Sequence, residues 1–224
     1  MTEPARHTDI TILLDRSGSM ESMREETVAG FNTFLNQQKQ EPGTASLTLI
    51  QFDNRFELHY KCVPLDEVTD LAQQDFVPRG GTALLDAMGR TINGTRRRIR
   101  RLPEASRPDQ VIVVILTDGL ENASHHYSLQ RVNRMVAAGR KTDWKFIFIG
   151  ADQDAIASGR QLGIADDYSI RFSRSREAVS STWGTLHQVS SRIRREGSAA
   201  SGFTDEERTS SMGEEPDRDD EDRG

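Results

Sequence analysis

The amino-acid sequence predicts an α/β protein with a doubly wound, Rossmann-like three-layer sandwich architecture. Short apolar runs typical of buried strands alternate along the chain with segments whose apolar residues recur at helical spacing. The most apolar run, residues 110–117, is typical of a central parallel strand that is covered on both faces. Strands separated by helices require right-handed crossovers, so we expect helices on both sides of a mostly parallel sheet.

In the first half of the chain we expect three strands and two helices. Residues 9–14 are a short apolar run suited to a buried strand, and apolar positions at helical spacing then predict an amphipathic helix over residues 21–38. Residues 45–52 and 56–63 are two β-rich runs separated by an Asp-Asn-Arg turn. This pattern predicts a hairpin whose second strand is antiparallel at the sheet edge. A second helix is expected over residues 84–102.

In the second half the same alternation continues after residues 110–117. Ser128 is a suitable N-cap for a helix that we expect to end at Gly139. Later elements are expected at residues 144–150 (strand), 152–162 (helix), 168–172 (strand) and 179–193 (helix, with Trp183 in its apolar face). The chain therefore has six candidate strands.

Composition favours a single domain with an appendage. The chain has 224 residues, of which 35% are hydrophobic and 29% charged. No run approaches the roughly 18 consecutive apolar residues of a membrane span, and the polar start lacks the apolar segment of a signal peptide. Cys62 is the only cysteine, which excludes an internal disulfide framework and a cysteine-based metal site. We therefore expect a cytoplasmic protein that does not enter a membrane.

The acidity of the chain is concentrated near its C-terminus. Residues 196–224 hold 11 acidic and 3 basic residues, whereas residues 1–195 hold 24 and 26. Few bulky apolar residues occur after residue 196, so this segment is not expected to offset its ordering entropy by burial. We expect a flexible N-terminus (1–8), a folded domain (9–195) and a disordered acidic tail (196–224). The nearly neutral domain gives no global indication of nucleic-acid binding.

Carboxylates and hydroxyls follow two predicted strands, at the sheet edge where open α/β folds bind ligands. Residues 15–19 read Asp-Arg-Ser-Gly-Ser, Asp118 follows the most apolar strand, and Thr82 lies in the loop before the second helix. If the first and fourth strands are neighbours, about 4.8 Å apart, Asp15 and Asp118 crowd together and need a cation between them. Oxygen ligands without His or Cys indicate Mg²⁺, with Mn²⁺ or Ca²⁺ as alternatives.

Together these residues resemble the metal-ion-dependent adhesion site (MIDAS) of the von Willebrand factor A (VWA) domain, over about residues 8–195. The resemblance implies that Ser17, Ser19 and, in one state, Thr82 ligate the metal directly. Asp15 and Asp118 would act directly or through water. It also implies the sheet order 3-2-1-4-5-6, in which the strands before these two carboxylates are neighbours.

The resemblance also implies a function. VWA domains are commonly binding modules without catalysis, in which a partner's Asp or Glu completes the metal coordination. We therefore expect a non-enzymatic, Mg²⁺-dependent scaffold or adaptor. Stand-alone intracellular members are often found with AAA-type ATPases, kinases or phosphatases, which makes these classes candidate partners.

The residues alone leave other interpretations open. Taken singly, Asp-Arg-Ser-Gly-Ser is also a suitable helix-capping loop. A metal-dependent hydrolase is the alternative function, because His125 and His126 follow the Asp118 loop and can supply a base to Ser17 or Ser19. Phosphoryl transfer at the same carboxylates is a further alternative.

Two charged segments are candidate docking elements. A basic run at the end of the second helix is either a solvated helix end or a docking site for an acidic partner or RNA; it comprises Arg96, Arg97, Arg98, Arg100 and Arg101. No aromatic residue interleaves these arginines, which argues against stacking on single-stranded nucleic acid. The acidic tail is a candidate ligand for the metal site itself, in cis or from a neighbouring copy.

Overall fold

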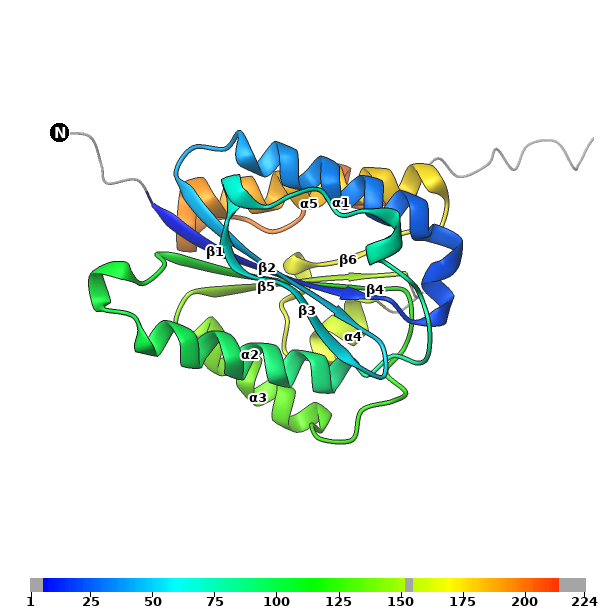
Figure 1. The fold of residues 1–224 in the computed structure, drawn as a ribbon, viewed down its shortest axis with the longest axis horizontal. Helices are drawn as coiled ribbons and strands as arrows, with labels where there is room; N and C mark the ends of the chain where they lie inside the picture. Colours follow the sequence, from blue (N-terminus) through cyan, green and yellow to red (C-terminus); the bar gives the residue numbers. More distant parts are fainter. Residues whose placement is uncertain (1–5, 152–154, 214–224) are drawn as a thin grey trace, which may run out of the picture.

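Six strands form one sheet in the order β3-β2-β1-β4-β5-β6 (Figure 1), which confirms the expected topology. The computed structural model describes residues 6–151 and 155–213. All neighbouring strands are parallel except the β2–β3 hairpin. The strands are β1 (His7–Asp15), β2 (Thr44–Phe52), β3 (Phe56–Pro64), β4 (Gln110–Thr117), β5 (Trp144–Gly150) and β6 (Ser169–Arg171).

Helices cover both faces of the sheet, as the doubly wound prediction requires. Figure 1 shows α1 and α5 on one face, and α2, α3 and α4 on the other. The helices are α1 (Arg24–Lys39), α2 (Leu84–Arg101), α3 (Leu129–Arg140), α4 (Ala155–Gln161), α5 (Arg176–Glu196) and α6 (Asp205–Ser210). No helix among the described residues is long and apolar enough to cross a bilayer.

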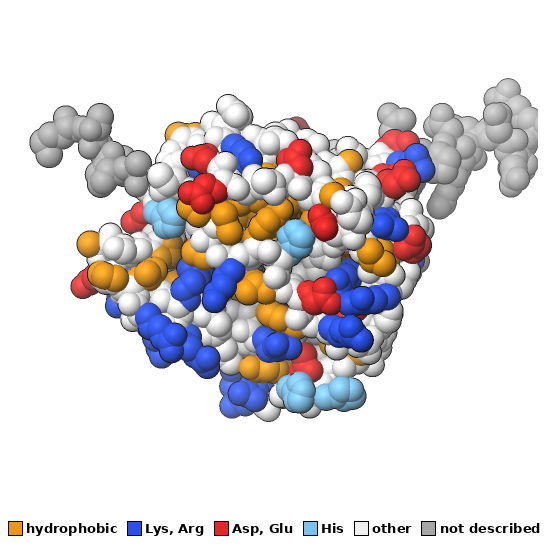
Figure 2. Space-filling model, in the orientation of Figure 1, with side chains coloured by type: hydrophobic (Ala, Val, Ile, Leu, Met, Phe, Trp, Pro, Cys, Tyr) orange, Lys and Arg blue, Asp and Glu red, His pale blue; other side chains and the backbone are white. Residues whose placement is uncertain are grey.

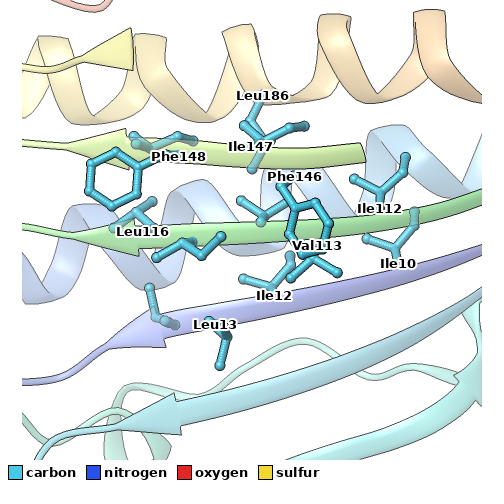
Figure 3. Packing of buried hydrophobic residues seen from close by; sticks show 14 of the residues in the cluster. Ile10, Ile12, Leu13, Ile112, Val113, Leu116, Phe146, Ile147, Phe148 and Leu186 are labelled. Atoms are coloured by element: carbon cyan, nitrogen blue, oxygen red, sulfur yellow. The ribbon is translucent and has the colours of Figure 1, made fainter. Parts of the chain in front are cut away.

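The core lies between the central strands and the helices (Figure 3). Ile12 of β1, Val113 of β4, Ile147 of β5 and Leu186 of α5 are fully buried. Burying one such side chain stabilises the fold by about 1.5–3 kcal/mol relative to exposing it. Because apolar side chains on both faces of β1 and β4 are covered, the two strands that lead to the candidate site are fixed from both sides.

Helix α1, which follows the loop after β1, is held in place by close packing against α5. A Cβ atom on Gly30 would lie 2.0 Å from the Trp183 ring, so only glycine fits at this crossing. Trp183 is 1% exposed and meets Phe31 edge to face at 6.0 Å, which confirms its expected place in the core.

Two helix ends differ from the sequence prediction. The residues expected to open the first helix form a 3₁₀ turn instead, Gly18–Met23, and α1 begins only at Arg24. Gly139 does not end α3, which continues to Arg140. It is a packing position, because a Cβ there would lie 2.8 Å from the Phe146 ring. The first three residues of the helix expected at 152–162 lie outside the described residues.

The expectation of a disordered tail from residue 196 is wrong for the described part of that segment. The 3₁₀ turn Gly197–Ala199 and helix α6 pack against the domain, with Phe203 only 7% exposed. Thr204 and Glu207 form a capping box that starts α6. Arg192 of α5 lies 2.6 Å from the buried Glu207.

A short segment therefore gains enough burial and capping to fold despite its polar composition. Residues 214–224, which hold seven of the 11 acidic residues of the tail, lie outside the described residues. At the other end, β1 begins at His7, two residues before the expected domain start.

Candidate metal site

Asp15 is the last residue of β1 and is held by donors on both carboxylate oxygens. The Ser17 amide donates to Oδ1 at 2.7 Å, and the Thr117 hydroxyl at the end of β4 donates to Oδ2 at 2.6 Å. Burial raises the pKa of Asp15 to about 6, against these hydrogen bonds, and the charge of Asp118 adds to the rise. The adjacent, parallel β1 and β4 thus bring two carboxylates together, as expected from their order.

Asp118 leaves one carboxylate oxygen without a hydrogen-bond donor. Its side chain is fully buried, and the Ser19 hydroxyl donates to Oδ1 at 2.6 Å. The second oxygen, Oδ2, accepts no hydrogen bond and forms a longer ion pair with the half-exposed Arg174, whose Nη2 lies 3.4 Å away. A buried carboxylate oxygen without a donor is costly unless a cation or water compensates it.

Three hydroxyls converge on the same point. Ser17 Oγ and Ser19 Oγ are 3.2 Å apart. A Cβ atom built on Gly119 would lie 3.1 Å from Thr82 Oγ1, 3.8 Å from Ser19 Oγ and 4.0 Å from Ser17 Oγ. The missing side chain of Gly119 therefore leaves room in front of the hydroxyls.

Thr82 is positioned by glycine-assisted turns and by the loop after β4. Gly80 has φ +66°, a conformation that favours glycine, and its carbonyl accepts from the Gly18 amide at 3.1 Å. The Thr82 amide donates to Asn122 Oδ1 at 2.9 Å, and the Asn122 amide returns a bond to the Thr82 carbonyl at 3.1 Å. Three loops far apart in the sequence are thus joined at one sheet edge.

The residues present fit a hard divalent cation. The structure brings Asp15, Ser17, Ser19, Thr82 and Asp118 together, and every donor is an oxygen, as Mg²⁺ prefers. No group of three or more His, Cys, Asp or Glu side chains among the described residues is suited to a metal. The cluster described above has only two carboxylates, so a metal ion bound there would take its remaining ligands from hydroxyls and water.

The motif's second residue, Arg16, has a structural role that the sequence did not reveal. Its guanidinium is almost completely buried and turns towards the hairpin, where Nε lies 3.2 Å from Asp53 Oδ2 and Nη2 lies 2.6 Å from Glu57. Arg79 contacts the same two carboxylates. These hydrogen bonds and charges, with that of Arg16 the largest, lower the pKa of Glu57 to about 2. The ion-pair network connects the loop after β1 (residues 16–19, here called the metal loop) to β2 and β3.

Arg174 is a second residue that sequence analysis missed. It follows β6, and its Nη2 donates to the Asp118 carbonyl at 2.5 Å. No motif surrounds it, so only the fold shows that this half-exposed cation lies beside the site.

The structure does not pair the candidate hydrolase histidines with a serine. His125 and His126 are exposed, and their backbone amides each donate to Asp86 at 2.9 Å. No hydrogen bond joins either imidazole to Ser17 or Ser19 within this described region. The pairing of His125 or His126 with Ser17 or Ser19, on which the hydrolase alternative depends, is therefore not formed among the described residues.

The basic run lies at the far end of α2, away from the hydroxyls. This helix has 18 residues, which corresponds to about 27 Å of rise. Arg98 turns inward and pairs with the buried Asp9, so it differs from the other four arginines of the run. Of the 11 acidic residues in the tail that was expected to reach the metal site, the seven at positions 214–222 lie outside the described residues.

An apolar pocket of about 270 Å³ adjoins the hydroxyl cluster and shares Gly119 with it. Leu84, Leu85 and Phe148 line it, and at its rim Leu120 is 64% exposed. The loop is nevertheless anchored, because both carboxylate oxygens of Glu121 accept bonds from neighbouring donors. An exposed apolar side chain thus lies at the rim of the pocket, next to the polar hydroxyl cluster.

Comparison with known proteins identifies the family. The sequence model of the von Willebrand factor type A domain matches residues 9–182, and the chain belongs to this family. Domains of the family are typically protein-interaction modules. Among curated protein sequences, none matches this chain.

Solved structures share the fold at low sequence identity. Proximal thread matrix protein 1 from the mussel byssus, in a form with a zinc-occupied MIDAS motif, is 17% identical, with a TM-score of 0.57, over 84% of this chain and 46% of that one. A von Willebrand factor type A protein from Catenulispora acidiphila is 13% identical (TM-score 0.57; 84% and 43% covered). The pilus adhesin SpaC from Lactobacillus rhamnosus GG is 14% identical (TM-score 0.59; 85% and 31% covered). The chain thus spans less than half the length of each.

Proposed function

We propose that this domain is a non-enzymatic, metal-dependent protein-binding module whose metal takes its last ligand from a partner's Asp or Glu. The observation that carries the proposal is the buried Asp118 Oδ2, which has no hydrogen-bond donor and lies in the same cluster as three converging hydroxyls. Ser17, Ser19 and Thr82 would hold the ion with Asp118, while Asp15, bonded on both oxygens, would orient the loop or act through water. Bound there, the ion supplies a positive centre for a carboxylate.

The surroundings of the site are suited to a protein partner. The adjoining pocket of about 270 Å³ lies at the small end of the range of small-molecule pockets, roughly 300–1,000 Å³. It is open and has Leu120 at its rim, so it suits one apolar side chain next to the coordinating carboxylate. Mg²⁺ is the proposed metal, with Mn²⁺ and Ca²⁺ as alternatives, because all donors are oxygens.

The proposed partner classes rest on analogy with family members, and the proposed compartment rests on the cysteine content. AAA-type ATPases, kinases and phosphatases remain the candidate partner classes for a scaffold or adaptor, by analogy with stand-alone family members. The single cysteine supports a reducing compartment such as the cytoplasm.

The proposal is tested by thermal unfolding of the full chain with MgCl₂ or with EDTA. A ligand at ten times its Kd stabilises the folded state by about 1.4 kcal/mol, which raises the Tm of a domain of this size by about 3–5 °C. The Ser17→Ala/Ser19→Ala double variant is expected to lose this shift. Ser22→Ala is the matched control, because Ser22 lies in the same turn but bonds only to the Ser19 carbonyl.

Binding is then measured with a defined probe, the peptide Gly-Gly-Asp-Leu-Gly-Gly, by calorimetry in Mg²⁺ and in EDTA. The proposal requires binding only with Mg²⁺ and loss of that binding in the double variant. An equal Mg²⁺ shift in the double variant, or equal peptide binding in EDTA, would refute it.

A further inference from the structure

A second pocket, of about 440 Å³, lies at the opposite edge of the sheet from the hydroxyl cluster. It is formed by the C-terminal end of α2, the segment before β4 and the start of β5. Its principal lining residues are Arg96, Ile99, Arg100, Arg107, Val111 and Trp144. Figure 2 shows basic side chains gathered over the region where α2 and α3 lie in Figure 1.

The positive charge of this edge is only partly offset, because one carboxylate, that of Asp109, also lines the pocket and accepts the His7 amide at 2.7 Å. Five arginines at this edge form no ion pair within the described residues: Arg96, Arg97, Arg100, Arg101 and Arg107. Arg98 differs from them, because it pairs with the buried Asp9 of β1. The α2 arginines form two like-charged pairs at i,i+4 spacing, an arrangement that destabilises a helix. The negative end of the helix dipole offsets only part of this repulsion. An external anion would neutralise the remainder.

Two of the guanidinium groups at the pocket are anchored but keep free donors. Arg96 Nη2 donates to the Met135 carbonyl at 3.5 Å, and Arg107 Nε donates to the Leu102 carbonyl at 3.3 Å. Because a guanidinium has five N–H donors, each retains several for a ligand. The cations are thus held in place around the pocket by backbone acceptors on α3 and at the end of α2.

The wall of the pocket is apolar but offers no stacking surface. Ile99 and Val111 line it, and Trp144 is only 8% exposed. Single-stranded nucleic acids bind through exposed aromatic faces combined with a basic groove, and no aromatic residue lies exposed among these arginines. Carboxylates flanking an apolar side chain match both the rim and the wall.

We propose that this pocket is a second, metal-independent docking site for an acidic segment of a partner protein. One apolar side chain of that segment enters the pocket between α2 and the start of β5, and its flanking carboxylates bond to Arg96, Arg100 and Arg107. The site needs no metal, so it does not depend on the function proposed for the other edge.

The test uses the full chain in EDTA, so that the hydroxyl cluster is not supplied with metal. The probes are Glu-Glu-Asp-Leu-Glu-Glu, its Leu→Ser analogue, and a twelve-nucleotide oligouridine, each titrated by fluorescence anisotropy at physiological salt. We expect the leucine peptide to bind several-fold more tightly than the serine peptide and the RNA. Arg100→Glu is expected to weaken it by about tenfold, because an attraction is replaced by a repulsion.

Two further variants separate charge from shape. Arg55→Glu makes the same charge change in the exposed β2–β3 turn, at the other end of the sheet, and is expected to alter binding less than twofold. Ala138→Phe fills the pocket from an exposed position of α3 without a charge change, and is expected to reduce the leucine peptide to the level of the serine peptide. Circular dichroism confirms that each variant is folded.

Three results would each overturn the proposal. They are equal binding of the two peptides, an effect of Arg55→Glu as large as that of Arg100→Glu, and tighter binding of the oligouridine than of the leucine peptide.

Discussion

Replacing Arg16 with methionine tests whether the ion-pair network behind the metal loop stabilises the domain. Methionine keeps most of the side-chain length but removes the guanidinium that contacts Asp53 and Glu57. Asp53 is 2% exposed on its side chain, so it would remain as a buried carboxylate with Arg79 as its cationic partner.

The expected cost is intermediate between that of a surface and that of a buried ion pair. Removing one partner of a buried pair destabilises a protein by about 3–5 kcal/mol. Since Arg79 Nε still lies 2.9 Å from Asp53 Oδ2, part of the compensation remains. We therefore expect Arg16→Met to lower the free energy of unfolding by about 2–3 kcal/mol. This is a large fraction of the roughly 5–15 kcal/mol of a typical domain.

Urea unfolding in EDTA at pH 7 measures this cost without a contribution from metal. The control is a double-mutant cycle with Asp53→Asn, in which the two substitutions should be non-additive by at least about 1 kcal/mol. Additive effects, or a loss below about 0.5 kcal/mol for Arg16→Met, would show that the network does not stabilise the fold.

The same variant has a pH signature. The hydrogen bonds and charges of Arg16, the largest contributor, and of Arg79 lower the pKa of Glu57 from its usual 4.5 to about 2. A lowered carboxyl pKa stabilises the folded state above pH 4.5, and this contribution is lost as the pH falls from 4.5 towards 2. Arg16→Met should flatten the decline of stability in that window. An unchanged profile would contradict the assignment to Glu57.

Three further predictions concern other parts of the molecule. Gly119→Ala places a methyl group 3.1 Å from Thr82 Oγ1, in the space that the metal's ligands would occupy, so calorimetry should show at least about a tenfold loss of Mg²⁺ affinity. Because Gly119 is not among the residues with positive φ, we expect the stability in urea to be unchanged. Phe203→Ala should cost about 3 kcal/mol in urea unfolding, because this buried ring anchors the segment around α6; a cost below about 1 kcal/mol would mean that the segment contributes little. Burial raises the pKa of Tyr168 to about 12 and its hydroxyl bonds to the Ala200 carbonyl, so stability should fall as the pH rises from 10 towards 12, and Tyr168→Phe should remove that slope.

The sheet and the candidate site could be anticipated because their signals are local. Each strand is a contiguous apolar run, and Asp15, Ser17 and Ser19 lie within five residues at the end of one strand. Arg16 could not be assigned, since its partner Asp53 lies 37 residues away and belongs to a hairpin turn whose expected role was only to reverse the chain.

The wrong predictions for the tail and for Gly139 have a common physical origin. They were based on the average composition of a segment or on the usual preference of a residue type, and a single tertiary contact outweighs both. The segment after residue 196 is polar on average, yet Phe203 and the capping box of α6 give it a defined structure. Glycine is typical of the end of a helix, but Gly139 packs against the Phe146 ring and lies inside α3.

The ordered segment around α6 also has a consequence for the sheet. β6 is a three-residue strand at the edge of the sheet, and none of the described residues forms a strand on its outer side. Arg208 of α6 donates to the Ser169 carbonyl at 2.7 Å, and Ser211 donates to the Arg171 carbonyl at 2.6 Å. These side chains occupy acceptors that another chain would need in order to add a strand. The segment thus protects the domain against edge-to-edge aggregation, and a chain that ends at residue 196 would expose this edge to self-association.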